Sequence, residues 1–197
     1  MFTGIVESVG KIVSKVQDKS NLILWVQADF AHELKIDQSV SHNGVCLTVT
    51  EIKDDTFSVT LINETVKRTS FYALAEGSLV NLERCMPANG RFDGHIVQGH
   101  VDQTGICTNV ADKNGSWAYE FEFDGSKGNF TVEKGSVTIN GVSLTVVDSG
   151  DGSFSVAIIP YTFEHTNFNT LKKGDIVNLE FDILGKYLKK IYESLRK

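Results

Sequence analysis

Two histidines and one cysteine are the side chains in this sequence best suited to chemistry. His95 and His100 lie five residues apart in NGRFDGHIVQGHVD, residues 89–102, and Cys46 lies in NGVCLTV, residues 43–49. A spacing of five is not that of a helical metal pair, and on a strand it places the rings on opposite faces. The histidines are therefore either polar strand residues or functional groups, and Cys46 is either a buried small residue or a nucleophile. Neither a nucleophile elbow nor a glycine-rich phosphate loop accompanies them.

The segment around Cys46 occurs twice. NGVCLTV returns as NGVSLTV at residues 140–146, with Ser143 in place of the cysteine, and 97 residues also separate the two copies of VNLE at 80–83 and 177–180. The segment GIVE at residues 4–7 aligns with GHVD at 99–102, at an offset of 95. A repeat near half the chain length indicates two homologous domains rather than a solenoid. We therefore expect two related pockets, suited to two copies of one ligand or to two similar ligands.

Composition restricts the class of protein. The 197 residues are 41% hydrophobic and carry a net charge of −6, and the 19 Lys and Arg form no basic block, so nucleic acid is not expected as a partner. There is no signal-like start, and no apolar stretch approaches the roughly 18 residues of a spanning helix. Three cysteines without metal-like spacing argue against a disulfide framework or a zinc site. We predict a cytoplasmic protein with reduced thiols and no membrane segment.

Apolar residues recur mostly at every second position, as in the run from Tyr119 to Phe123, and turn signals interrupt them at short intervals. This pattern predicts an all-β fold of two similar small antiparallel barrels. The tail from about Leu184 to Lys197 instead has apolar residues at helical spacing and no counterpart in the first repeat. Its apolar stripe must pack either on its own barrels or on another subunit, and we favour the second.

Five motifs, taken in order over essentially the whole chain, resemble the riboflavin synthase family (alpha-chain type): MFTGIVE, NGVCLTV, GHIVQGHVD, KGSVTINGVSLTV and IPYTFEHT. The resemblance implies two homologous six-stranded antiparallel Greek-key barrels followed by a C-terminal α-helix. It divides the chain into lumazine-binding barrels at 1–95 and 96–184 and an oligomerisation helix at 185–197. It also implies a homotrimer, with each active site between the N-terminal barrel of one subunit and the C-terminal barrel of the next.

The resemblance further implies a reaction, the last step of riboflavin biosynthesis. Two molecules of 6,7-dimethyl-8-ribityllumazine react by transfer of a four-carbon unit, which gives riboflavin and 5-amino-6-(D-ribitylamino)uracil. A proton must leave the C7 methyl group of one lumazine, and a nucleophile must add at C7 of the other. The electron-poor ring stabilises the carbanion, so no metal or organic cofactor is expected. Two substrates held face to face would gain their rate largely from proximity.

The site residues implied by the resemblance follow the motifs. The catalytic candidates are Ser39, Cys46, His95, His100 and Asp182, with Phe2 covering a pocket. The first pocket would use Gly4, Ile5, Val6, Cys46, Leu47, Thr48, Ile62, Glu64 and Thr65. The second would use Gly99, His100, Val101, Lys134, Ser143, Leu144, Thr145, Ile159 and Thr162. A neutral His100 is a candidate base, and Cys46, Ser39 or a water that they orient is a candidate nucleophile.

Asp93 and Tyr161 depart from the family pattern without touching the catalytic set. Because Cys46 and Ser143 differ, the two pockets can assign different roles to identical substrates, and we expect the acceptor lumazine on the side of Cys46. One alternative is a lumazine- or flavin-binding fluorescent protein of the same fold, which binds its ligand without catalysis. A flavin-binding reductase is disfavoured because no nicotinamide-binding domain follows. Association with lumazine synthase, which the resemblance implies for some members only, is left open.

Overall fold

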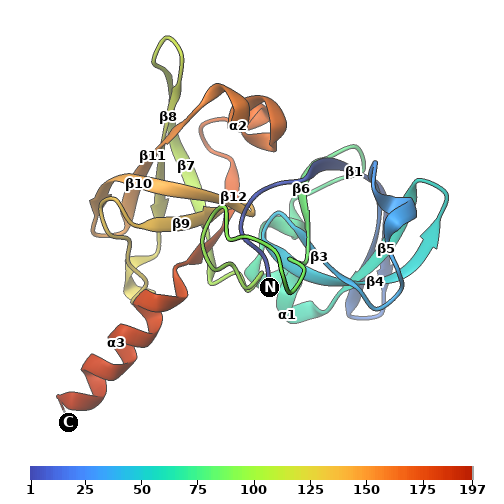
Figure 1. The fold of residues 1–197 in the computed structure, drawn as a ribbon, viewed down its shortest axis with the longest axis horizontal. Helices are drawn as coiled ribbons and strands as arrows, with labels where there is room; N and C mark the ends of the chain where they lie inside the picture. The colour runs from blue at the N-terminus through green and yellow to red at the C-terminus, as the bar shows by residue number, and fades with distance from the viewer. Residues whose placement is uncertain (197) are drawn as a thin grey trace.

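In a computed structural model, which describes residues 1–196, the chain forms two closed antiparallel barrels side by side (Figure 1). The strand order of the first barrel is β1-β2-β5-β4-β3-β6. This order places β2 beside β5 and closes the barrel where β1 meets β6. The strands are β1 (Ser8–Asp18), β2 (Asn21–Gln27), β3 (Ser39–His42), β4 (Val45–Lys53), β5 (Thr56–Leu61) and β6 (Leu79–Arg84).

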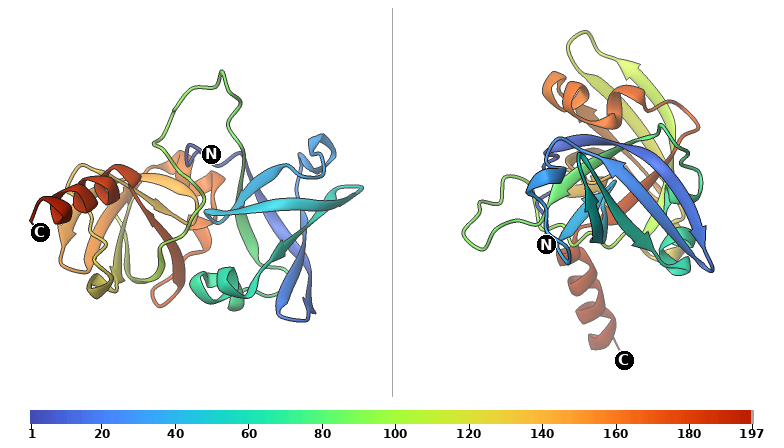
Figure 2. Two further views of the ribbon diagram at one scale, coloured as in Figure 1. Left: turned by 90° about the horizontal axis from the view of Figure 1, so that it is seen from below. Right: turned by 90° about the vertical axis from the view of Figure 1, so that its right-hand side faces the viewer.

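The second barrel repeats the same topology with the order β10-β11-β8-β7-β12-β9. The prediction of two six-stranded antiparallel barrels is therefore confirmed. The predicted domain boundary between residues 95 and 96 lies in the connection from β6 to β7, which projects as a long green loop in Figure 2. The strands are β7 (Gln103–Asp112), β8 (Trp117–Phe123), β9 (Ser136–Ile139), β10 (Val142–Gly150), β11 (Ser153–Ile158) and β12 (Ile176–Phe181).

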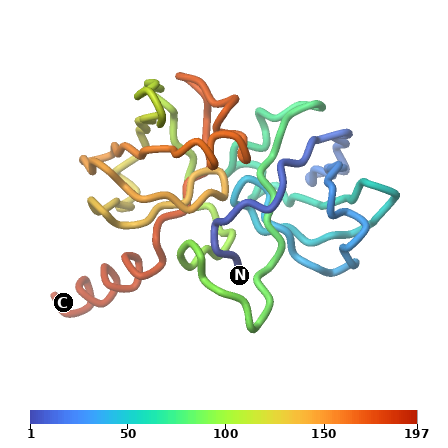
Figure 3. The backbone as a smooth tube through the Cα atoms, turned by 45° about the horizontal axis from the view of Figure 1, so that its top comes forward, coloured from blue at the N-terminus to red at the C-terminus, as the bar shows by residue number. Residues whose placement is uncertain are grey.

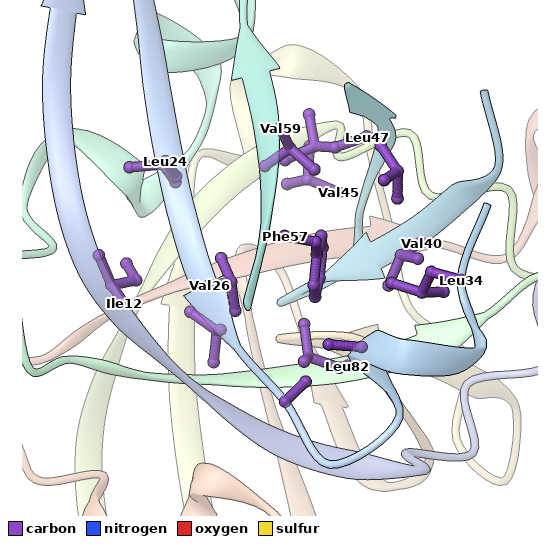
Figure 4. Packing of buried hydrophobic residues seen from close by; sticks show 14 of the residues in the cluster. Ile12, Leu24, Val26, Leu34, Val40, Val45, Leu47, Phe57, Val59 and Leu82 are labelled. Atoms are coloured by element: carbon purple, nitrogen blue, oxygen red, sulfur yellow. The ribbon is translucent and has the colours of Figure 1, made fainter. Parts of the chain in front are cut away.

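Each barrel encloses its own apolar core. In the first barrel, Val45 and Leu47 of β4 point inward beside the buried ring of Phe57 (Figure 4), and Val49 belongs to the same buried core. Since side chains alternate along a strand, Cys46 and Thr48 point to the outer surface of the barrel. The second barrel buries Val142, Leu144 and Val146 of β10 in the same way, which leaves Ser143 on the outside. The period-two pattern thus fixes the reactive positions on the barrel exteriors.

The two Asn-Gly pairs of the repeat form tight turns that meet between the barrels. Asn43 and Gly44 join β3 to β4 with φ angles of 44° and 80°, and Asn140 and Gly141 join β9 to β10 with 46° and 81°. These left-handed conformations are the ones that a two-residue hairpin loop requires. A Cβ on Gly44 would lie 2.9 Å from the backbone nitrogen of Gly141. Neither glycine can therefore take a side chain unless the barrels separate.

Buried asparagines join the barrels around these turns. The side-chain amide of Asn81 donates to the carbonyl of Asn140 at 2.9 Å, and that of Asn178 donates to the carbonyl of Asn43 at 2.9 Å. The side chain of Asn167 donates to Oδ1 of Asn43 at 3.0 Å. All five residues are at most 8% exposed, and buried polar groups are costly unless they are paired. The hydrogen bonds therefore hold the barrels in one relative orientation, with approximate twofold symmetry.

Helices occupy a small part of the chain. The helix α1 (Asn63–Arg68) follows β5, and α2 (Pro160–His165) follows β11 at the equivalent place. Short 3-10 turns are η1 (Ala31–Glu33), η2 (Ser70–Tyr72), η3 (Gly125–Lys127) and η4 (Asn167–Thr170). The predicted C-terminal helix is confirmed as α3 (Ile183–Leu195), which extends away from the barrels (Figures 1 and 2).

Candidate functional site

Two extended segments cross between the barrels and each lies on the barrel of the other repeat. Phe2 and Val97 pair as an isolated antiparallel bridge, with N–H···O distances of 2.8 and 3.1 Å. Figure 3 shows the blue N-terminal segment running between the two barrels, near the green connection that joins them. Beyond this bridge, the carbonyl of Gly99 accepts the N–H of Cys46 at 2.8 Å. At the equivalent place, the carbonyl of Gly4 accepts the N–H of Ser143 at 2.8 Å. Residues 97–101 therefore cover the N-terminal barrel, and residues 2–6 cover the C-terminal barrel.

This arrangement corrects the grouping that the order of the motifs suggests. Gly4, Ile5 and Val6 do not lie with Cys46, and Val6 packs against the core of the C-terminal barrel. Val101 packs against the core of the N-terminal barrel instead. The grouping is wrong because each segment leaves its own barrel and crosses to the other. A sequence offset of 95 detects the equivalence of the segments but not the exchange.

A buried glutamate anchors each crossing segment. Glu83, at the end of β6, accepts the N–H and hydroxyl of Thr3 at 2.6 and 2.8 Å and the N–H of Gly4 at 2.9 Å. Glu180, at the end of β12, accepts three consecutive backbone N–H groups at 2.7, 2.9 and 2.9 Å, those of Gln98, Gly99 and His100. Burial raises the pKa of both glutamates, and that of Glu180 to about 7, although the N–H donors favour the ionised form.

The face of the N-terminal barrel, here called the cysteine face, carries Ser39, Cys46 and His100. Ser39 lies on β3, which pairs with the start of β4, and its hydroxyl lies near the half-buried Cys46 thiol. Burial raises the pKa of this thiol, and the Ser39 hydroxyl only partly opposes the shift. Cys46 is therefore mostly a neutral thiol at pH 7, which is a weak nucleophile. The ring of His100 is exposed, and its backbone is held by Glu180.

The rim of the cysteine face is formed by the end of β5 and the start of α1. Val49 pairs with Val59, so the antiparallel register brings the end of β5 toward the start of β4. Ile62 is 57% exposed there, and Glu64 forms an ion pair with Arg68. Thr48 is exposed and Thr65 is half-buried, whereas the side chain of Leu47 is in the barrel core. Leu47 can therefore contribute only its backbone to a ligand.

The face of the C-terminal barrel, here called the serine face, brings His95 to Ser143. Nδ1 of His95 lies 2.7 Å from Oγ of Ser143, and Nε2 lies 3.2 Å from Oγ1 of Thr138. Burial lowers the pKa of His95, and the nearby carboxylate of Asp182 opposes this shift. The ring is thus mostly neutral at pH 7, and the tautomer with an unprotonated Nδ1 can accept the proton of Ser143. Asp182 also caps α3 by accepting the N–H of Leu184 at 2.9 Å.

The remaining predicted residues of the serine face mirror those of the cysteine face. Ile159 is 58% exposed, Thr145 is exposed and Thr162 is half-buried, whereas the side chain of Leu144 lies in the core. Lys134 is exposed at the turn before β9. Tyr161, which occupies the place of Glu64, stacks on His165 with ring centroids 4.1 Å apart. The five catalytic candidates are thus divided, with His95 and Asp182 on this face.

One predicted position has a different character in the structure, and three residues were missed. Phe2 is fully buried, and its ring lies against Gly99 beside Cys46, so it supports the crossing rather than lining an open surface. Thr138 was not predicted. The two anchoring glutamates were also missed, although VNLE occurs in both repeats and its final residue would have been a usable signal.

No group of three or more His, Cys, Asp and Glu within residues 1–196 is placed to hold a metal ion. Cys46, Cys85 and Cys107 are free. No helix in the same part of the chain has both the length and the apolar character needed to cross a membrane.

Comparison with known proteins matches both repeats. Residues 3–85 and 98–182 each match the family model of the lumazine binding domain. The chain is 45% identical over 189 residues to riboflavin synthase from Actinobacillus pleuropneumoniae, which covers 95% of this chain and 88% of that protein. It is 40% identical over 198 residues to riboflavin synthase from Bacillus subtilis (strain 168), which covers 100% of this chain and 91% of that protein. The chain belongs to the riboflavin synthase family.

A solved structure of LumP complexed with riboflavin has the same fold, with a TM-score of 0.85 over 92% of this chain and 99% of that chain. Its sequence identity is 23%, so this likeness supports the fold alone. The match of the lumazine binding model to each half agrees with the two equivalent faces. Within this riboflavin synthase family member, the cysteine and serine faces share their anchors and differ in their reactive side chains.

Proposed function

We propose that this chain catalyses the dismutation of two molecules of 6,7-dimethyl-8-ribityllumazine into riboflavin and 5-amino-6-(D-ribitylamino)uracil. The observation that best supports this proposal is that two faces of the same architecture present different reactive groups. These groups are a neutral thiol at Cys46 and a hydroxyl–imidazole pair at Ser143 and His95. Two identical substrates can therefore bind in equivalent ways and react differently. The rate enhancement comes mainly from holding them together in the required orientation.

The serine face binds the lumazine that donates the four-carbon unit. Ser143, or a water molecule that it orients, adds to C7 of this lumazine while Nδ1 of His95 accepts the proton. Asp182 lies near His95 and favours its protonated form, so it stabilises the imidazolium produced by this step. The cysteine face binds the acceptor lumazine, whose C7 methyl group loses a proton to His100. Cys46 and Ser39 lie beside this lumazine and orient its C7 methyl group toward His100, so they act on the rate of the reaction more than on binding.

The two lumazines meet between subunits of a homotrimer. In one chain, the crossing segments 2–6 and 97–101 lie between the cysteine face and the serine face. The helix α3 also leaves its apolar stripe exposed, with exposed fractions from 55% to 80% at Leu184, Tyr187, Leu188, Ile191, Tyr192 and Leu195. Burial of such a stripe on neighbouring subunits is favourable at about 25 cal/mol per Å². Each active site would then combine the cysteine face of one subunit with the serine face of the next.

The decisive assay is incubation of the purified protein with 6,7-dimethyl-8-ribityllumazine, followed by chromatography of the products. We expect two lumazines to be consumed for each riboflavin formed, with an equal amount of 5-amino-6-(D-ribitylamino)uracil. A tightly bound fluorescent lumazine with no riboflavin would replace this proposal with the binding-protein alternative.

Mixing two inactive variants tests the shared site. His100→Ala disables the cysteine face, and Ser143→Ala disables the serine face. If sites form between subunits, subunit exchange brings an intact cysteine face beside an intact serine face, and part of the activity returns. Activity that does not return after confirmed subunit exchange would show that each site is built within one chain.

A further inference from the structure

The two crossing segments have a second anchor, and its charged partner differs between the repeats. In the first segment, Glu7 accepts the N–H of Arg84 at 3.2 Å. In the second, Asp102, at the equivalent position, accepts the N–H of Phe181 at 2.8 Å. The backbone part of this anchor is thus conserved by the duplication.

The cation that pairs with each carboxylate comes from a different place. In the first repeat, Nε of Arg84 donates to Oε2 of Glu7 at 2.7 Å. The equivalent position in the second repeat is Phe181, whose side chain is packed in the barrel core and carries no charge. Lys186 of α3 supplies the missing cation, with Nζ 2.6 Å from Oδ2 of Asp102. The helix that has no counterpart in the first repeat therefore completes the second anchor.

This ion pair is better protected from solvent than the others at the surface. The side chains of Lys186 and Asp102 are 28% and 20% exposed, against 62% and 61% for the pair of Arg68 and Glu64. Reduced exposure limits screening by water and salt, so the pair can hold its geometry. The pair is consequently better suited to hold α3 against the segment than a fully exposed pair would be.

The anchored segment bears directly on the cysteine face. Between Gln98 and Asp102 it presents the Gly99 carbonyl to the N–H of Cys46 and carries His100. We propose that Lys186 is a positioning residue for the reaction, which ties α3 to this segment and so sets the placement of His100 over the cysteine face. This inference rests on the proposed function, and it means that assembly through α3 and the geometry of the cysteine face are coupled.

Substitution of Lys186 by methionine removes the charge and keeps most of the apolar stem. Since a displacement of about 1 Å can cost roughly 100-fold in rate, partial loosening should lower kcat about tenfold, with KM changed less than about twofold. Lys186→Arg should restore most of the loss because it retains the cation. Lys190→Met is the matched control, since Lys190 lies on the same helix, is exposed and forms no ion pair within residues 1–196. It should retain full activity.

Asp102→Asn tests the same link from outside the helix, so it leaves the assembly surface of α3 intact. It should lower kcat to a similar extent, and the double variant with Lys186→Met should be no worse than either single variant. Sedimentation should show the same oligomer for every protein compared. Equal kcat values for Lys186→Met and Lys190→Met, or fully additive losses in the double variant, would overturn the inference.

Hydrogen exchange gives a readout that does not depend on catalysis. Lys186→Met should accelerate exchange of the Gly99 and His100 amides, and Lys190→Met should not. If the unmodified protein forms no riboflavin, the proposed function fails while this measurement still tests the link. If the unmodified protein is active and the exchange rates of these amides are unchanged in Lys186→Met, the link itself is refuted.

Discussion

Substitution of Gly99 by alanine should disable the cysteine face and leave the fold largely intact. A Cβ at this position would lie 2.6 Å from Cβ of Cys46 and 2.9 Å from its backbone nitrogen. Carbon atoms pack at about 3.5 to 4.0 Å, so the segment would have to move by about 1 Å. That movement stretches the 2.8 Å hydrogen bond between Cys46 and Gly99 and displaces His100.

Two separate costs contribute, and a second glycine distinguishes them. Gly99 has a φ of +78°, so alanine pays about 1 kcal/mol for the left-handed conformation regardless of space. Gly77 has a φ of +89° with nothing within 4 Å of its ideal Cβ, so Gly77→Ala carries the conformational cost without the overlap. Displacement of the active-site segment by about 1 Å corresponds to roughly 100-fold in kcat, or about 2.7 kcal/mol in the activation free energy.

The assay is steady-state formation of riboflavin, together with denaturant unfolding of both variants. We expect Gly77→Ala to lose about 1 kcal/mol of stability and to retain its kcat. Gly99→Ala should lose about 100-fold in kcat beyond the control. If the two variants have kcat values within about threefold of each other, the close packing of the crossing segment on Cys46 is not required for catalysis, and the reasoning fails.

Three further predictions concern other parts of the molecule. Cys46→Ser should slow turnover and leave lumazine binding largely intact, as measured by single-turnover kinetics and fluorescence titration; weakened binding with an unchanged single-turnover rate would contradict this role. Burial lowers the pKa of His42 from 6.5 to about 4, so the unfolded chain binds a proton at a higher pH than the folded chain does. The free energy of unfolding is therefore unaffected by His42 above about pH 6.5, and it falls by roughly 3 kcal/mol as the pH drops toward 4. Isoleucine occupies the equivalent position in the second repeat, Ile139. His42→Ile should therefore make the free energy of unfolding, measured by urea titration at each pH, less dependent on pH, and an unchanged pH dependence would contradict this account. Introduction of aspartate at Leu188 and Ile191 should dissociate the proposed trimer in sedimentation experiments and abolish activity, whereas an active monomer would rule out a shared site.

The sequence was sufficient to predict the two barrels because a closed antiparallel sheet requires a simple periodic pattern of apolar residues. Apolar residues that face the core alternate with residues that face outward, and the duplication repeats this pattern at a fixed offset. The outward positions of Cys46 and Ser143 follow from the same alternation. The helix α3 was predictable for a similar reason, since its apolar residues recur with the helical period. The sequence also shows directly that the first repeat has no segment equivalent to this helix.

Tertiary structure alone decided which residues share a face. Gly4 and Cys46 belong to the same repeat, yet the crossing segments place Gly4 on Ser143 and Gly99 on Cys46. The buried glutamates that hold those segments, and the lysine on α3 that replaces an arginine, are likewise long-range partners. Alternation and repeat offsets report local geometry and equivalence, because each residue's pattern depends on its own strand. Which segment lies on which barrel depends on how the two complete barrels pack against each other. The residues that determine this packing are far apart in the sequence, so they produce no periodic pattern along the chain.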